Sequence, residues 1–267
     1  MAELGLEGPV IGVAYDGTGY GADGTVWGGE ILIADRREFE RVGHLRAVPL
    51  PGGEAAIRHP ARMALSYLID AFGPEEGVAK ARRLMPHLSE AEARVVARQV
   101  ERGINSPACS SMGRFFDAIA AMLGATPEPT YEGQPAMELE AMCGGRGNAR
   151  PTAHAHEIVG GVIDTRPVVR KVAEDVERGV DVGEIAARFH ETVARFTVDV
   201  CHRLHEDGGP SDVVLCGGVM QNARLVGRLV ELLAEAGLKA HIHREIPPND
   251  GGMSLGQGVA GALRSSR

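Results

Sequence analysis

The segment Val213-Val-Leu-Cys-Gly-Gly-Val-Met-Gln-Asn222 joins a short apolar run to a stretch with helical periodicity. A strand, two glycines and a helix start in this order bring backbone N–H groups together, because glycine permits tight turns and the first helical N–H groups are unpaired. Such a junction can hold an anionic ligand such as a nucleotide, and the Asn222 amide can contact its ribose or base. Taken alone, Asn222 is better explained as a helix cap.

Two further glycine-rich segments also follow apolar runs: Val13-Ala-Tyr-Asp-Gly-Thr-Gly-Tyr-Gly21 and Pro247-Pro-Asn-Asp-Gly-Gly252. Each carries a carboxylate, Asp16 or Asp250, that can ligate a divalent metal. Taken alone, the first segment is about equally well explained as a hairpin turn, and the second is better explained by a capping aspartate. Because loops at strand ends of one sheet converge on one cleft, we predict that all three segments line a single nucleotide site.

The chain as a whole predicts an α/β fold. Its regions are a sheet over 9–45, a helical segment over 54–206 and a strand-helix-strand-helix unit over 212–264. In the sheet, the apolar patterns predict a meander of strands at 9–15, 25–34 and 39–45. In the last unit they predict strands at 212–216 and 239–243 and helices at 222–236 and 253–263. Residues 144–151 are predicted to form a loop or an insertion boundary.

Capping residues and apolar periodicity support the helical segment. Ser89 begins a capping-box pattern, and Gly103 is placed to end the helix that follows. Ser110 or Ser111 can cap the next helix. The longest helix has apolar residues every three or four positions over 185–204, a stripe that is typical of core packing.

Composition limits the function classes. The 267 residues are 44% hydrophobic and 24% charged, as in globular proteins, and the net charge of −8 argues against non-specific attraction to DNA. No run approaches the roughly 20 apolar residues of a membrane helix, so we expect a cytoplasmic protein with neither DNA nor a membrane as partner. The 4 cysteines form no Cys-x-x-Cys pair and are expected to be buried, reduced thiols.

A long, ordered set of motifs resembles the carboxyl-terminal transferase domain of the HypF carbamoyltransferases, which is related to tRNA threonylcarbamoyladenosine transferases. These motifs run almost from end to end: Asp16-Gly-Thr-Gly-Tyr-Gly, Trp27-Gly-Gly-Glu30, Pro49-Leu-Pro-Gly-Gly53, Ile104-Asn-Ser-Pro107, Ser111-Met-Gly-Arg-Phe-Phe-Asp117, Tyr131-Glu-Gly133, Cys216-Gly-Gly-Val-Met-Gln-Asn222 and Pro247-Pro-Asn-Asp-Gly-Gly-Met-Ser-Leu-Gly-Gln257.

The resemblance implies both a fold and an activity. The fold is a lobe of the actin, sugar-kinase and Hsp70 class, with a mixed sheet and a large helical insertion. In the family, carbamoyl phosphate and ATP give a carbamoyl-adenylate, and this domain passes the carbamoyl group to the C-terminal cysteine of HypE. That group becomes the cyanide ligand of [NiFe]-hydrogenase. We therefore expect ATP or carbamoyl-adenylate, a divalent metal (Fe, Zn or Mg) and a HypE-like acceptor as ligands and partner.

The resemblance also implies roles for individual residues. Asp117 matches a ribose-binding aspartate, although its place in the helix pattern also suits an exposed charged residue. Asn222 matches the adenosine-side asparagine, and Asp16 and Asp250 match metal ligands. The remaining nucleotide-binding positions are Asp16, Gly17, Thr18 and Gly19 in the phosphate-side loop, Gly133 and Gln134 near the sugar, and Gly217 and Gly218 beside the adenylate.

The family carries a His-His-x-Ala-His metal motif shortly before its Asp-Gly-Thr-Gly-Tyr-Gly loop, and none of the 10 histidines here has that spacing. The resemblance therefore implies that the amino-terminal lobe is missing from this sequence and that upstream HypF domains act in cis or in trans. We expect little transfer by the chain alone. A non-catalytic nucleotide-binding or docking lobe stays an alternative, as does a related O-carbamoyl or tRNA threonylcarbamoyl transferase.

Overall fold

A mixed sheet forms the centre of the computed structural model, which describes residues 1–144 and 151–265. Its strands are β1 (Val10–Tyr20), β2 (Val26–Ala34), β3 (Phe39–Leu45), β4 (Val48–Pro49), β5 (Ala108–Cys109), β6 (Glu157–Val159), β7 (Val162–Asp164), β8 (Asp212–Cys216) and β9 (Lys239–His241). The main path runs β6-β7-β3-β2-β1-β8-β9, with β4 and β5 beside β2. The predicted meander of β1, β2 and β3 is antiparallel, and β8 and β9 extend it in parallel. The predicted mixed α/β sheet is thus confirmed.

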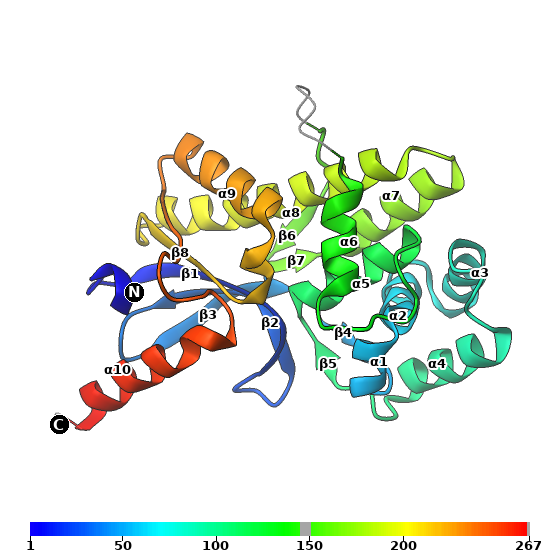
Figure 1. Cartoon of the computed structure of the whole chain (residues 1–267), viewed down its shortest axis with the longest axis horizontal. Helices are drawn as coiled ribbons and strands as arrows, with labels where there is room; N and C mark the ends of the chain where they lie inside the picture. Colours follow the sequence, from blue (N-terminus) through cyan, green and yellow to red (C-terminus); the bar gives the residue numbers. More distant parts are fainter. Residues whose placement is uncertain (145–150, 266–267) are drawn as a thin grey trace.

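The helices lie around this sheet. They are α1 (Glu54–Arg58), α2 (Pro60–Phe72), α3 (Pro74–Leu84), α4 (Glu90–Arg102), α5 (Met112–Met122), α6 (Gln134–Met142), α7 (Arg166–Glu177), α8 (Val182–Glu206), α9 (Ala223–Glu235) and α10 (Met253–Ser265). Figure 1 shows α8 and α9 above the central strands, α10 below them, and α1 to α4 together at the other end of the molecule. A hydrogen bond of 2.7 Å between the hydroxyls of Tyr15 and Thr197 ties β1 to α8.

The predicted helix caps are present. The Ser89 side chain accepts from the Glu92 N–H at the start of α4, and Gly103 ends that helix in the left-handed conformation. Ser111, one of the two predicted candidates, caps α5 by accepting from the Arg114 N–H. These side chains satisfy backbone donors that an uncapped helix leaves unpaired.

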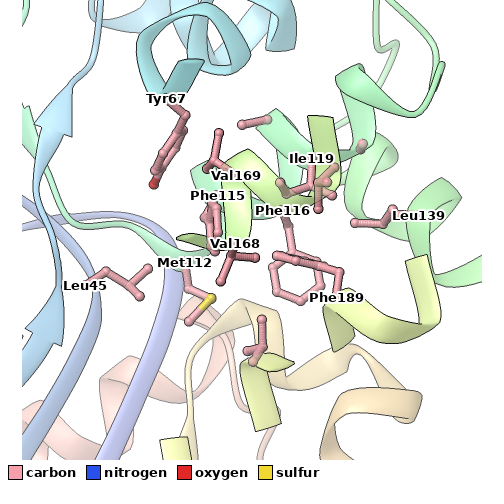
Figure 2. Close-up of a cluster of buried hydrophobic side chains, with 14 of the residues drawn as sticks. Leu45, Tyr67, Met112, Phe115, Phe116, Ile119, Leu139, Val168, Val169 and Phe189 are labelled. Carbon is pink, nitrogen blue, oxygen red and sulfur yellow. The ribbon is translucent and has the colours of Figure 1, made fainter. Parts of the chain in front are cut away.

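The apolar core surrounds α5, whose residues are all buried. The ring of Phe115 lies between the rings of Tyr67 from α2 and Phe189 from α8, with centroid distances of 4.9 and 5.1 Å. Figure 2 shows these rings together with Phe116 and Ile119. Because close-packed interiors allow little side-chain displacement, this packing holds the first turn of α5 in place.

β1 is longer than predicted. We expected the strand to end near Tyr15 and the glycines to form a loop, yet β1 continues to pair with β2 after an irregularity between Tyr15 and Gly19. The chain reverses at residues 21–25 instead, where the Asp23 carboxylate accepts from the Thr25 N–H at 3.0 Å. The first glycine segment is therefore a bulge within a strand, a feature that redirects nearby side chains.

Short strands interrupt the segment predicted to be helical. β5 pairs with β2 and β4, and the β6–β7 hairpin pairs with β3. Runs this short leave no alternating pattern in the sequence. The strand predicted at 239–243 also ends early, at His241. Most of the loop predicted at 144–151 lies outside the described residues.

The cysteines are free, as predicted, but only Cys109 and Cys201 are buried, whereas Cys143 and Cys216 are partly exposed. The prediction of four buried thiols is therefore wrong for two of them. Within residues 1–144 and 151–265, no helix combines the length and apolar character needed to cross a membrane.

The backbone at Gly217 excludes a side chain. Its φ is 97°, and a Cβ there would lie 2.1 Å from the Tyr15 carbonyl oxygen. We expect Gly217→Ala to lower the free energy of unfolding by about 2 kcal/mol or more, because both the left-handed conformation and the clash oppose the methyl group. Urea unfolding followed by circular dichroism measures this change.

The matched control is Gly227→Ala, on the exposed face of α9, where a Cβ would meet nothing within 4 Å. This substitution should raise the free energy of unfolding by about 0.5–1 kcal/mol, because alanine favours the helix. Equal stability of Gly217→Ala and wild type contradicts the packing described for Gly217.

Candidate functional site

A cavity of about 670 Å³ lies where the three glycine-rich segments meet α5 and α6. We call it the large cavity. Its lining includes Asp16, Asn222 and Asp250, the three residues predicted to lie together. Four more predicted site residues also line it: Gly17, Asp117, Gly133 and Gly218. Its volume falls within the range of about 300–1,000 Å³ that is usual for small-molecule sites.

Backbone contacts at Gly217 bring the three segments together. The Gly217 N–H donates to the Pro248 carbonyl oxygen at 2.8 Å, and its Cα faces the Tyr15 carbonyl. The neighbouring Gly218 faces the Asp16 carboxylate, because a Cβ there would lie 3.1 Å from Asp16 Oδ1. The second segment therefore lies between the first and the third.

The start of α5 packs directly against the bulge of β1. The Ser111 hydroxyl contacts the carbonyl oxygens of Asp16, at 2.8 Å, and of Gly17. A Cβ on Gly113 would lie 2.8 Å from the Gly17 Cα, so the two backbones touch. The first turn of α5 consequently forms one wall of the large cavity.

The motif Trp27-Gly-Gly-Glu30 contacts the segment that precedes α5. The buried Glu30 carboxylate accepts from the Gly29 N–H at 2.7 Å, from the Ser110 hydroxyl at 2.5 Å and from Arg41 Nη2 at 2.9 Å. A Cβ on Gly29 would lie 2.2 Å from the Ser110 carbonyl oxygen. Glycine and glutamate at these positions therefore hold the segment before α5 against β2.

Asp117 is buried, with 2% of its surface exposed, so the alternative of an exposed charge on a helix is wrong. Its Oδ2 lies 2.9 Å from Arg114 Nη2 in an ion pair of two buried side chains. Burial raises the pKa of the Asp117 carboxyl to about 6, Arg114 lowers it, and Glu132 raises it. Burial is thus the largest influence on the pKa of this carboxyl at the cavity wall.

Asn222 is held on two sides. Its Oδ1 caps α9 by accepting from the Leu225 N–H at 2.8 Å, and its Nδ2 lies 3.0 Å from His190 Nε2. Burial lowers the pKa of His190 to about 4. The neutral ring donates from Nδ1 to the Ala186 carbonyl at 2.8 Å, which leaves Nε2 to accept from Asn222. Asn222 therefore both caps α9 and lines the large cavity.

The other predicted residues lie elsewhere. Thr18 and Gly19 are exposed on β1, and Gln134 is engaged locally, with Thr130 and Glu138. None of these three is among the residues that line the large cavity. Gly217 lines a second, smaller cavity of about 260 Å³ that shares Asp16 and Asp250 with the first. Residue types alone do not show which side of a strand or helix faces a cavity.

Several lining residues had no predicted role: Arg114, Glu132, Glu140, Gln221 and Asn249. All of them except Glu140 stand within motifs that carry the family resemblance. Position within those motifs was therefore the available signal for these four residues.

Asp16 and Asp250 line both cavities, as metal ligands in one site would. Among the described residues, however, no group of three or more His, Cys, Asp or Glu side chains is arranged to hold a metal ion. Two carboxylates leave most coordination positions of a divalent metal to other ligands. The described part of the chain therefore does not form a complete metal site.

Comparison with known proteins identifies the family. The family described as carbamoyltransferase, Kae1-like domain, second subdomain, matches residues 12–257. The carbamoyltransferase HypF of Rhodobacter capsulatus is 40% identical over 96% of this chain and 33% of its own length. That of Rhizobium leguminosarum is 37% identical over 96% of this chain and 32% of its own. A HypF homolog of Cupriavidus necator is 38% identical, with coverages of 96% and 66%.

Solved structures agree with these sequence matches. Full-length HypF, crystallised in a phosphate- and nucleotide-bound form, has a TM-score of 0.91 and 41% identity over 98% of this chain and 41% of that one. HypF of T. kodakarensis has a TM-score of 0.89 and 33% identity over 100% of this chain and 35% of that one. The predicted resemblance and fold class are confirmed. The chain spans about a third of the curated HypF proteins from Rhodobacter and Rhizobium.

The contacts of His190 predict its titration. We expect the ring to stay neutral until the pH falls to about 4, because burial opposes its charge and Asn222 needs an unprotonated Nε2. In the unfolded chain the same histidine protonates near pH 6.5. Its contribution to the free energy of unfolding is therefore complete above pH 6.5 and decreases as the pH falls toward 4.

Nitrogen-15 NMR of the ring, recorded against pH in the folded protein and in urea, measures both midpoints. The expected result is a midpoint near 4 in the folded protein and near 6.5 in urea. A folded-state midpoint between 6 and 7 contradicts the described hydrogen bonds.

Proposed function

The chain belongs to the HypF carbamoyltransferase family, as the second subdomain of its Kae1-like domain, and from this we propose that it supplies the nucleotide cavity for carbamoyl transfer. The observation that carries the proposal is the convergence of Asp16, Asn222 and Asp250 on one cavity of about 670 Å³. Because these residues are remote in sequence, either packing or a common ligand must account for their place in one cavity. A cavity of this size, with polar groups on several walls, suits a ligand of nucleotide dimensions.

The proposed reaction moves a carbamoyl group from carbamoyl-adenylate to the C-terminal cysteine thiol of a HypE-like acceptor. The acyl C–O bond of the mixed anhydride breaks, a C–S bond forms, AMP leaves, and the thiol proton passes to solvent. The adenylate itself derives from carbamoyl phosphate and ATP. In the family this step supplies the future cyanide ligand of [NiFe]-hydrogenase, so we propose the same destination here.

The cavity offers groups for each part of this ligand. The Asp117 carboxylate and the Asn222 amide are proposed to contact the nucleoside, as the family resemblance implies. Gly17 and Gly218 let the ligand approach the backbone closely at the phosphate end. Transfer then requires the adenylate to be held with its carbonyl accessible to the thiol, and such positioning lowers the barrier.

A divalent metal is the remaining proposed component. Asp16 and Asp250 are proposed to supply two carboxylate ligands for Fe, Zn or Mg, and no larger group of such ligands occurs among the described residues. When bound, such a metal withdraws charge from phosphate and carbonyl oxygens. Upstream HypF domains, in cis or in trans, are the proposed source of the missing ligands.

One observation favours a second function. Because the described residues contain no complete group of metal ligands, the chain alone suits a non-catalytic role in which it binds nucleotide and docks the acceptor. The two functions share the cavity and differ in whether transfer occurs once the upstream domains are present.

Substitution of Asp250 separates metal-dependent transfer from nucleotide binding. With upstream HypF domains, ATP and carbamoyl phosphate supplied, we expect Asp250→Ala to reduce carbamoylation of the acceptor cysteine at least 100-fold, a loss of about 3 kcal/mol of transition-state stabilisation. Mass spectrometry of the acceptor detects the product.

Asp207→Ala, which removes an exposed carboxylate at the end of α8, is the control and should transfer at the wild-type rate. An Asp250→Ala rate equal to wild type refutes the assignment of Asp250. Tight ATP binding by calorimetry without any transfer in the supplemented wild type favours the non-catalytic role.

A further inference from the structure

The Arg114 guanidinium is buried with two nitrogen atoms unpaired. Its side chain is 4% exposed, and its Nη2 pairs with Asp117 Oδ2 at 2.9 Å. Its Nε and Nη1 have no hydrogen-bond partner in residues 1–144 and 151–265. A guanidinium cannot release its proton in a protein, and buried polar groups without partners are rare. A ligand with oxygen acceptors in the large cavity, which Arg114 lines, would supply acceptors that the guanidinium lacks.

The charges around Arg114 point to the class of ligand. Apart from Arg114, the charged side chains that line the large cavity in the described part of the chain are all carboxylates: Asp16, Asp117, Glu132, Glu140 and Asp250. An entering phosphate is repelled by these groups unless a cation lies close to it. A guanidinium fork matches the spacing of phosphate oxygens and binds them through two parallel N–H groups.

The position of Arg114 is fixed by its surroundings. It stands in the first turn of α5, where its N–H donates to the Ser111 hydroxyl at 3.1 Å. On the cavity side it faces Gly17, since a Cβ there would lie 3.5 Å from Arg114 Nη2. The absence of a side chain at Gly17 leaves the approach to the guanidinium open. A fixed cation with an open approach is preorganised for an anion.

We propose that Arg114 binds a phosphate group through the unpaired Nη1 and one N–H of Nη2, while the other N–H of Nη2 stays paired with Asp117. The inference rests on the proposed function, because it assigns a residue to the same cavity. The phosphate belongs either to the nucleotide or to a separate phosphate or acyl phosphate, and the chemistry of recognition is the same. Through Arg114 the phosphate and the Asp117 carboxylate form one connected unit.

A purely structural role for Arg114 requires its charge but not its fork. Lysine can keep a cation near Asp117, yet it cannot present two parallel donors to a phosphate. Arg114→Lys therefore distinguishes the two roles. The matched control is Arg228→Lys, because Arg228 is 11% exposed and pairs with Glu191 and Glu231 away from the cavity.

The experiment measures binding of AMP, adenosine and inorganic phosphate by calorimetry to wild type, Arg114→Lys and Arg228→Lys. We expect Arg114→Lys to weaken AMP binding about 10- to 100-fold and to leave adenosine binding within about threefold of wild type. Arg228→Lys should leave all three affinities unchanged. A loss confined to inorganic phosphate assigns Arg114 to a separate phosphate, whereas a loss for AMP assigns it to the nucleotide.

Equal AMP and phosphate affinities in Arg114→Lys and wild type overturn the inference but leave the proposed function intact. Equal losses for AMP and adenosine also overturn it, because they indicate general damage to the cavity. Failure of the wild type to bind either AMP or adenosine contradicts the proposed function itself and this inference with it.

A measurement on the wild-type protein applies even if Arg114→Lys does not fold. Nitrogen-15 NMR follows the Arg114 Nη–H groups directly. Saturating AMP, or phosphate if that is the source, should shift their signals and slow their exchange with water, whereas adenosine should do neither. A signal that responds to none of these ligands overturns the inference.

Discussion

The passage of Gly217 between the carbonyl groups of Tyr15 and Pro248 is the contact on which the cavity depends. The Gly217 N–H bonds to Pro248 on one side, and its Cα faces Tyr15 with no room for a side chain on the other. These three residues belong to the three glycine-rich segments, so one backbone contact joins parts of the chain that are far apart in sequence. The glycine therefore serves packing and the site at once.

Around this contact the molecule combines an apolar core with a small number of buried charges. α5 shows the combination most clearly, because Phe115 and Phe116 anchor it in the core while Arg114 and Asp117 face the cavity. Burying these charges lowers the stability of the fold unless they pair with each other or with a ligand. Core packing and the wall of the large cavity are thus coupled within a single turn of helix.

Most of the fold follows from local patterns in the sequence. The meander, the caps at Ser89 and Ser111 and the long helix α8 all arise from short-range preferences that apolar periodicity and capping residues reveal. The extension of β1 was not predictable in this way, because a run of glycines after a strand is typical of a turn. Pairing with β2, a tertiary interaction, decides that it stays extended.

Family motifs in the sequence predicted part of the candidate site. The placement of the other residues depends on tertiary contacts and could not be predicted. Asp16, Asn222 and Asp250 follow from three glycine-rich segments that come after apolar runs, and they do share the large cavity. The burial of Asp117 depends on neighbours from other elements, and the link between Asn222 and His190 joins positions 32 residues apart. The apolar periodicity of a single helix reveals neither this burial nor this hydrogen bond.

Hydrogen–deuterium exchange with and without AMP tests most directly whether the three segments form one nucleotide site. We expect amide exchange to slow together in peptides that cover residues 12–20, 216–223 and 248–253, while peptides from α3 and α4 are unaffected. Slowing in only one of these segments, or in α3 and α4 instead, would contradict the account.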